Sequence, residues 1–338
     1  MNALPPPPPI EEAGPVDFSR FHDEIRPRRQ PVVMRGVAAG WPGVAAARQG
    51  DRAIADYLLG FGTAKPVRGI MAPPEAGGRF FYDAGMTGFN FTEHHGRLDA
   101  FLDELLRIAG EPRPNGMAVQ SETIPELLPG FVAANPMPLL PDVAPRIWLG
   151  NRISVAPHYD LKENVGVCLA GRRRFTVFPP EQMPNLYPGP FELTPAGTPV
   201  SMVDPRNPDL DRNPRFAEAW AHARQATLEP GDAIYLPFAW WHGVEALEPV
   251  SILVNYWWND APEGSGRSYD GLLHALLAYR HLPADQRAVW RMMFDHYIFG
   301  DDDPAAHLPA HAKGILGPAS PRLFAQMREM LRRIFSQP

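Results

Sequence analysis

The feature that most constrains the fold is a closely spaced series of short apolar runs between about residues 145 and 258. Gly, Pro, Asn and Asp separate these runs, which occupy 146–149, 153–158, 164–170, 174–178, 226–228, 233–236, 243–246 and 251–258. Short strands at close spacing predict an antiparallel sandwich or barrel. A fold of alternating strands and helices is not favoured, because no helical segment separates the strands.

Helical segments flank this β region on both sides. Apolar residues recur at helical spacing in 51–60 and 97–109, after a short helix expected at 18–25 and a buried strand at 31–37. Beyond residue 265, the same spacing predicts helices at 269–279 and 284–299. Ser320 and Pro321 then begin a last helix with one apolar stripe. That stripe must be buried against the chain's own barrel or against a second subunit.

Proline and loop residues predict the remaining organisation of the chain. Residues 1–15 contain Pro5 to Pro9 in a row, so we expect a disordered polyproline II tail. Residues 181–224 are rich in Pro, Asp and Asn and are expected to form a long loop, a feature that is often functional. The expected arrangement is therefore a tail of 1–15, a β domain of 16–265 and a helical region of 266–338.

Composition excludes several classes of protein. The net charge is −6 and no basic run occurs, so nucleic acid is not a favoured partner. No apolar stretch approaches 18 residues, so we expect no membrane span. Cys168 is the single cysteine, which rules out a disulfide within the chain and suits a reducing compartment. The N-terminus lacks the basic and apolar regions of a secretory signal. We therefore expect a cytoplasmic protein.

Two histidines and an aspartate within the β region form a potential metal site. His158 and Asp160 are two residues apart, and in a strand such side chains point to the same face. His242 must come from a second strand folded back beside them. Two imidazoles and one carboxylate are the facial triad of non-haem Fe(II) oxygenases, which leaves metal positions open for an oxidant and a co-substrate. A structural role remains the alternative for each histidine taken alone.

The sequence around these residues resembles the JmjC or cupin-like oxygenases. The resemblance rests, in order, on residues 148–160, 171–180, 237–242 and 254–258, and more modestly on 31–37 with Trp41-Pro42. Within that superfamily the chain is most similar to the branch that holds the asparaginyl hydroxylase of hypoxia-inducible factor. The resemblance implies a double-stranded β-helix, a jelly-roll or cupin core that is mainly β with flanking helices. It also implies an enzyme that uses Fe(II), O2 and 2-oxoglutarate to hydroxylate a protein side chain or a small amino-acid-like substrate.

The same resemblance implies which residues bind the co-substrate. Arg173 lies in the strand where this branch usually carries a lysine for the distal carboxylate, and a guanidinium can grip a carboxylate with two nitrogens. Asn164 and Asn255 match asparagines that contact the co-substrate near the metal. Tyr82 resembles a tyrosine that faces the substrate channel, and Trp257 shares a strand face with Asn255. Structural roles in turns, strand ends or the core are the alternatives for these last four.

Two departures from the family pattern keep a second function open. Val155 stands where related enzymes often have Thr or Ser, and Ala118 stands where the branch has tyrosine, so two hydroxyls are missing from the distal carboxylate pocket. The alternative is a non-catalytic metal-binding cupin that acts as a sensor or scaffold. Similar enzymes dimerise through their C-terminal helices, so the resemblance also implies a homodimer.

Overall fold

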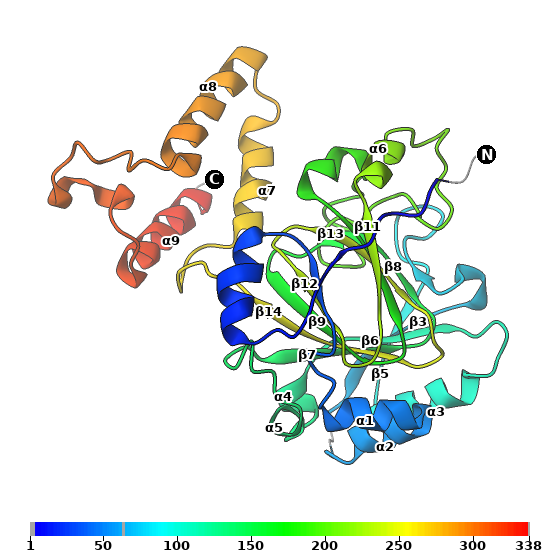
Figure 1. Cartoon of the computed structure of the whole chain (residues 1–338). Helices are drawn as coiled ribbons and strands as arrows, with labels where there is room; N and C mark the ends of the chain where they lie inside the picture. The colour runs from blue at the N-terminus through cyan, green and yellow to red at the C-terminus, as the bar shows by residue number, and fades with distance from the viewer. Residues whose placement is uncertain (1–3, 63–64, 337–338) are drawn as a thin grey trace. The chain divides into compact units, whose positions relative to one another are not determined.

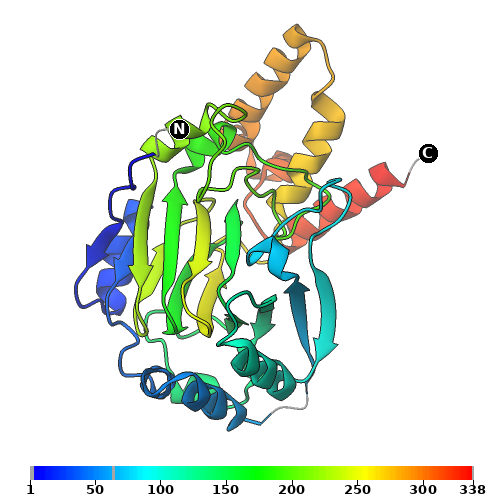
Figure 2. The ribbon, with the colours of Figure 1, turned by 90° about the vertical axis from the view of Figure 1, so that its right-hand side faces the viewer.

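A computed structural model describes residues 4–62 and 65–336 of the chain. Its contacts divide the chain after Asn259 into two units, which are described separately. In the described residues, the first unit contains two sheets that face each other (Figures 1 and 2). The larger has the order β1 (Glu11–Ala13), β2 (Val32–Met34), β12 (Ala233–Leu236), β9 (Glu163–Ala170), β14 (Ser251–Trp258), β7 (Pro145–Gly150), β6 (Gly116–Thr123), β3 (Val67–Ala72) and β5 (Thr92–Gly96). The smaller has the order β11 (Arg224–Leu228), β10 (Arg173–Phe178), β13 (Trp241–Ala246), β8 (Ser154–Tyr159) and β4 (Arg79–Phe80).

The chain from β7 to β14 passes back and forth between the two sheets. Strands β7, β9, β12 and β14 lie in the larger sheet, and β8, β10, β11 and β13 lie in the smaller one. Neighbours among these eight strands pair antiparallel. This arrangement is a double-stranded β-helix, and the predicted fold class is confirmed. Each predicted strand from 146 to 258 corresponds to one observed strand, and β14 has the predicted bounds.

Alternate side chains of each strand fill the space between the sheets. Phe175 and Val177 of β10 pack there with Ile234 and Leu236 of β12. Since side chains two apart share a face, Arg173 at the start of β10 also points into this interior. The intervening residues of the larger sheet face outward and join a second apolar cluster with the N-terminal helices.

Helices cover the outer face of the larger sheet (Figure 1). The helices on this side include π-helix η1 (Arg20–Ile25) and helices α1 (Pro42–Gln49), α2 (Asp51–Leu59), α3 (Leu98–Ile108), α4 (Ile124–Leu127) and α5 (Phe131–Ala134). The first unit also contains the 3-10 helices η2 (Arg26–Arg28) and η3 (Pro74–Ala76). Leu58 of α2 and Leu102 of α3 are buried in the same cluster as Val165 and Val167 of β9. The apolar spacing that predicted α2 and α3 therefore corresponds to the faces these helices bury.

The expectation of a disordered tail is wrong for the described residues 4–15. Proline lacks an N–H, but its carbonyl still accepts hydrogen bonds, and Gln225 N donates to Pro8 O at 2.9 Å. Ile10 N donates to Gln225 O at 3.0 Å, and the Ile10 side chain is buried in the barrel core. Trp220 Nε1 donates to Pro5 O at 2.7 Å. The segment therefore continues the smaller sheet past β11, and residues 1–3 lie outside the described part.

The predicted loop of 181–224 is largely irregular but anchored. It contains 3-10 helix η4 (Pro180–Asn185) and helix α6 (Phe216–Ala221). Leu186 and Phe216 are buried beside Phe178, Tyr159 and Trp241 on the outer side of the smaller sheet. The loop is therefore held next to the strand ends that carry His158 and His242.

The second unit is helical, as expected after residue 265. It contains α7 (Ser268–Tyr279), α8 (Ala284–Phe294), π-helix η5 (Asp295–Phe299), 3-10 helices η6 (Ala310–Ala312) and η7 (Gly314–Leu316), and α9 (Pro321–Phe335). Ser320 Oγ accepts a hydrogen bond from Leu323 N at 3.2 Å, which confirms the predicted N-cap of α9. Large apolar side chains such as Leu277 (78% exposed) and Phe299 (73%) are not buried within this unit.

Membrane insertion finds no support in the helices. Within residues 4–62 and 65–336, no helix combines the length and apolar character that a bilayer crossing requires.

Candidate metal centre

The two histidines and the aspartate meet at one end of the smaller sheet. His242 of β13 pairs directly with His158 of β8, and their ring centroids are 4.4 Å apart. Asp160 follows β8 immediately, and its main-chain oxygen accepts from Ala239 N at 3.0 Å. One ligand atom from each of the three side chains lies within 4.8 Å of the others. This geometry suits a single metal ion bound by two nitrogens and one oxygen.

Main-chain hydrogen bonds set the same tautomer in both histidines. His158 Nδ1 lies 3.0 Å from Ala156 O, and His242 Nδ1 lies 3.0 Å from Trp240 O. A carbonyl only accepts, so Nδ1 carries a proton in both rings, and in a neutral ring Nε2 then keeps its lone pair. Burial and the nearby His242 lower the pKa of His158 to about 4, so this ring is neutral at pH 7. Neutral imidazoles with free Nε2 atoms are the form that binds metals.

Two donors orient the Asp160 carboxylate. Asn164 Nδ2 donates to Asp160 Oδ2 at 3.0 Å, and Trp257 Nε1 donates to the same oxygen at 3.1 Å. His242 Nε2 lies 3.6 Å from it. Hydrogen bonds of this kind fix metal-binding carboxylates in one orientation. Asn164 and Trp257 therefore contact the candidate metal centre through Asp160.

A second asparagine extends this network across the interior. Asn255 Nδ2 lies 3.3 Å from Asn164 Oδ1, and Trp148 Nε1 donates to Asn255 Oδ1 at 2.8 Å. The donors run in one direction, from Trp148 through the two amides to Asp160. Each buried amide therefore has partners for both of its ends, as buried polar groups require.

Arg173 lies elsewhere in the same interior and has no acidic partner among residues 4–62 and 65–336. Its side chain is buried, and its bonds within the described residues go to Ser251 Oγ at 2.9 Å, Ser251 O at 3.2 Å and Trp148 O at 3.5 Å. Burial lowers the pKa of Arg173 to about 10, so the group is still a cation at neutral pH. A buried cation whose observed hydrogen bonds go to neutral oxygens is suited to bind an anion.

The other predicted residues lie apart from this network. Tyr82 is buried, and its hydroxyl donates to Leu193 O at 2.9 Å rather than to the Asp160 network. Arg172 and Arg174, which flank Arg173, pair with Glu248 and Glu245 at 2.7 and 3.6 Å and point away from the interior.

Val155 and Ala118, which stand where related enzymes carry a hydroxyl side chain, have apolar surroundings. Val155 packs against the barrel core, and Ala118 is buried in a cluster with Phe80 and Ile153.

Sequence reasoning missed Trp148 and Ser251. Both lie on the inner faces of strands that were predicted correctly. Ser251 is four residues before Asn255, so strand alternation alone puts these two side chains on one face. That alternation was the signal available for Ser251.

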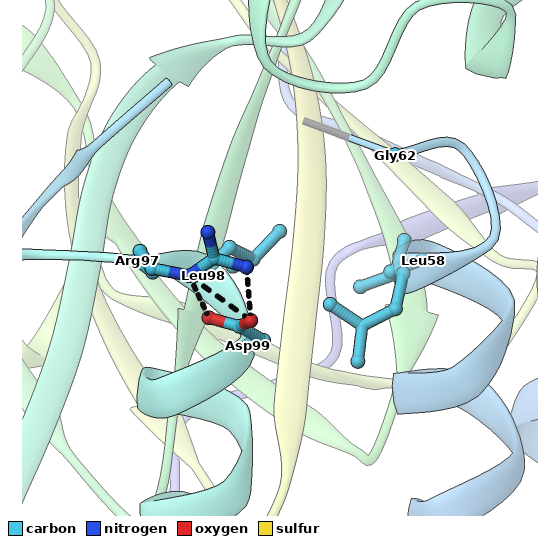
Figure 3. Close-up of a pocket in the computed structure, with 6 residues that line it drawn as sticks. Leu58, Gly62, Arg97, Leu98 and Asp99 are labelled. Carbon is cyan, nitrogen blue, oxygen red and sulfur yellow. Dashed lines mark hydrogen bonds and ion pairs between the residues drawn. The ribbon is translucent and has the colours of Figure 1, made fainter. Parts of the chain in front are cut away.

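A separate cavity of about 210 Å³ lies between the end of α2 and the start of α3 (Figure 3). Leu58, Leu59, Gly62 and Leu98 line it, together with Arg97 and Asp99. Arg97 and Asp99 form an ion pair with each other. None of the predicted site residues lines this cavity.

The fold and the site together define a double-stranded β-helix protein with a cluster of two histidines and one aspartate suited to a metal. The chain matches the family model described as the Cupin-like domain over residues 18–264. It therefore belongs to the cupin-like family, and the predicted JmjC or cupin-like family is confirmed. The narrower branch around the asparaginyl hydroxylase stays a prediction.

Two named proteins are similar to parts of this chain. Human HSPB1-associated protein 1 is 38% identical over 115 residues, which cover 33% of this chain and 22% of that protein. Lysine-specific demethylase 8 of Danio rerio is 26% identical over 251 residues, which cover 72% of this chain and 56% of that protein. The chain thus spans little more than half the length of these curated relatives, or less. The solved structure of E. coli ycfD aligns with 96% of this chain and 69% of that chain, at 19% identity and a TM-score of 0.42.

Proposed function

We propose that the protein is an oxygenase that depends on Fe(II) and 2-oxoglutarate and hydroxylates its substrate. The observation that carries this proposal is the cluster of His158, Asp160 and His242, with ligand atoms within 4.8 Å of one another. Two imidazoles and a carboxylate fit Fe(II) by donor type and leave coordination positions open. Fe(II), when bound, would supply the activation of O2 that is coupled to decarboxylation of the keto acid.

The buried Arg173 supports 2-oxoglutarate as the co-substrate. Val177 pairs with His242 and lies four residues along β10 from Arg173. At the rise of a β-strand, the Cα atoms of Arg173 and Val177 are about 13 Å apart. The arginine side chain covers part of this distance. A short dicarboxylate with its keto acid end at the metal and its distal carboxylate at Arg173 fits the remainder.

The predicted contacts near the metal complete the proposed pocket. An amide nitrogen carries two hydrogens, and the bonds described above use one from Asn164 and one from Asn255. We assign the second hydrogen of each to the co-substrate. Trp257 would form one wall beside Asp160, and Tyr82 would face the substrate channel.

We further propose a protein side chain as the substrate. One relative is named a lysine-specific demethylase and another is named for its association with HSPB1, which supports a protein partner. A small amino-acid-like substrate is the alternative.

Anaerobic titration of the protein with Fe(II) and then 2-oxoglutarate tests the enzyme proposal. We expect a visible charge-transfer band, and succinate formation once O2 is admitted. Asp160→Ala removes the only anionic side chain of the cluster. We therefore expect metal affinity and succinate formation to fall more than about 100-fold, which exceeds the loss typical when a residue hydrogen-bonded to a metal ligand is removed. Unchanged turnover in this variant would show that the metal site lies elsewhere.

The same experiment separates a second candidate, the non-catalytic metal-binding cupin. The apolar surroundings of Val155 and Ala118 favour it, because neither position offers a hydroxyl to a carboxylate. This candidate predicts tight metal binding in the wild type with no charge-transfer band on addition of 2-oxoglutarate and no succinate.

We also propose a cytoplasmic homodimer that associates through the second unit. The exposed apolar side chains of α7, α8 and α9, including Leu277, Met292 and Ile334, support a partner surface, because large exposed apolar patches mark interfaces. Light scattering at micromolar concentration should give twice the mass of one chain. Ile334→Asp should shift the protein toward a monomer, whereas a wild-type monomer would contradict the proposal.

A further inference from the structure

The side chain of Ser251 contacts the buried Arg173 from the opposite sheet. Ser251 is the first residue of β14 in the larger sheet and is fully buried, whereas Arg173 begins β10 in the smaller sheet. Arg173 Nε donates to Ser251 Oγ at 2.9 Å, and Nη2 donates to Ser251 O at 3.2 Å and toward Trp148 O at 3.5 Å. The guanidinium therefore bridges the barrel interior and is held on one edge by the larger sheet.

These bonds decide which part of the guanidinium is left for a ligand. A free arginine offers Nε and both Nη atoms, and usually grips a carboxylate with two of them. Here Nε and Nη2 are committed to Ser251 and Trp148. Nη1 makes no hydrogen bond within the described residues. The guanidinium thus presents mainly one nitrogen, much as a lysine ammonium would.

We propose that Ser251 is a positioning residue for the co-substrate and that it acts through Arg173. Ser251 holds the guanidinium of Arg173 so that Nη1 faces the distal carboxylate of the co-substrate. This orientation supports carboxylate binding in a pocket where Val155 and Ala118 provide no hydroxyl. Ser251 is fully buried, so its effect reaches the ligand through the guanidinium. This inference rests on the proposed binding of 2-oxoglutarate to Arg173.

A double-mutant cycle tests the inference in the full-length protein loaded with Mn(II). Calorimetry measures the affinity for 2-oxoglutarate in the wild type, Ser251→Ala, Arg173→Lys and the double variant. A hydrogen bond to a charged group is lost in Ser251→Ala, so we expect affinity to fall on the order of tenfold. In the Arg173→Lys background the same change should alter affinity by less than about twofold, because lysine has no Nε to hold.

Three controls separate positioning from a general structural effect. Ser251→Thr keeps the hydroxyl and should keep near wild-type affinity. Ser201→Ala removes another fully buried hydroxyl, which donates to Leu186 O, and should leave 2-oxoglutarate affinity unchanged. Mn(II) affinity should be the same for Ser251→Ala and the wild type, because Ser251 contacts Arg173 and none of the three metal-cluster residues.

The outcomes distinguish this inference from the proposed function. If the wild type binds Mn(II) but not 2-oxoglutarate, the proposed function itself is wrong. If the wild type binds 2-oxoglutarate and Ser251→Ala binds it equally well, only the role of Ser251 is overturned. Equal losses for Ser251→Ala and Ser251→Thr, or an undiminished loss in the Arg173→Lys background, would also overturn it.

Discussion

The two ends of the barrel interior are suited to ligands of opposite charge. At one end, His158 and His242 are held with free Nε2 atoms beside the carboxylate of Asp160. At the other, Arg173 is a buried cation whose neighbours are neutral oxygens. A buried charge without a counter-charge costs several kcal/mol. The first end therefore suits a metal cation and the second an anion, and a single keto acid bound to the metal would serve both.

The largest expected effect on co-substrate affinity comes from removing the cation at the second end. Arg173→Met keeps much of the side-chain volume but leaves the distal carboxylate without a partner. Loss of one member of a buried charge pair costs about 2–5 kcal/mol, so 2-oxoglutarate affinity should fall by about 30-fold or more. The ligand-free protein should gain about 1–4 kcal/mol in unfolding free energy, because an uncompensated buried charge is gone. Calorimetry and urea unfolding measure the two effects.

Arg174→Met is the matched control for this variant. Arg174 is the next residue of β10, points outward and lies 3.6 Å from Glu245. Its loss should change neither 2-oxoglutarate affinity nor, beyond about 1 kcal/mol, stability. If Arg173→Met bound 2-oxoglutarate like the wild type, the second end of the interior would have no role in co-substrate binding.

The positions of strands β7 to β14 were predictable from sequence, because each strand of the β-helix is an apolar run between turn residues. The eight runs between 146 and 258 each became a strand. Strand β5 was not predictable, because Thr-Glu-His-His-Gly is exposed throughout and shows no apolar alternation. The proline run was misjudged for a different reason: its order comes from contacts with Gln225 and Trp220, more than 200 residues away in the chain.

The clustering of the two histidines and the aspartate was predictable from sequence, but the hydrogen bonds around the cluster were not. Spacing and resemblance brought together His158, Asp160 and His242. They did not indicate that Asn164 and Trp257 donate to the same oxygen of Asp160, because such bonds depend on side-chain direction after folding. Ser251 was missed because its place on the same strand face as Asn255 does not by itself indicate a contact with Arg173 across the barrel.

Acidification should affect the metal end alone. The pKa of His158 in the folded, metal-free protein is about 4, below its ordinary value of 6.5. Above pH 6.5 the ring is neutral in both states. Between pH 6.5 and 4 the unfolded chain binds a proton that the folded chain does not, so stability falls as pH falls. Arg173, with a pKa of about 10, keeps its proton throughout this range.

We expect the unfolding free energy of the metal-free protein to drop by about 2 kcal/mol between pH 6.5 and 5.0 on account of His158. Urea unfolding of the wild type and His158→Gln at both pH values measures this. The difference in unfolding free energy between the wild type and His158→Gln should change by about 2 kcal/mol between pH 6.5 and 5.0. A constant difference would mean that His158 titrates with an ordinary pKa.

The smallest expected effect concerns the hydrogen bond from Asn164 to Asp160. If this bond orients the carboxylate, Asn164→Ala should weaken Mn(II) binding about tenfold, at the lower end of the range for such partners because Trp257 still donates to the same oxygen. The measurement is made without 2-oxoglutarate, so a role of Asn164 as a co-substrate ligand cannot produce the loss. Asn135→Ala, which removes a buried amide bonded to Gly43 N, should leave Mn(II) affinity unchanged. An unaltered Mn(II) affinity in Asn164→Ala, with weaker 2-oxoglutarate binding, would instead make Asn164 a contact of the keto acid and leave Trp257 as the donor that orients Asp160.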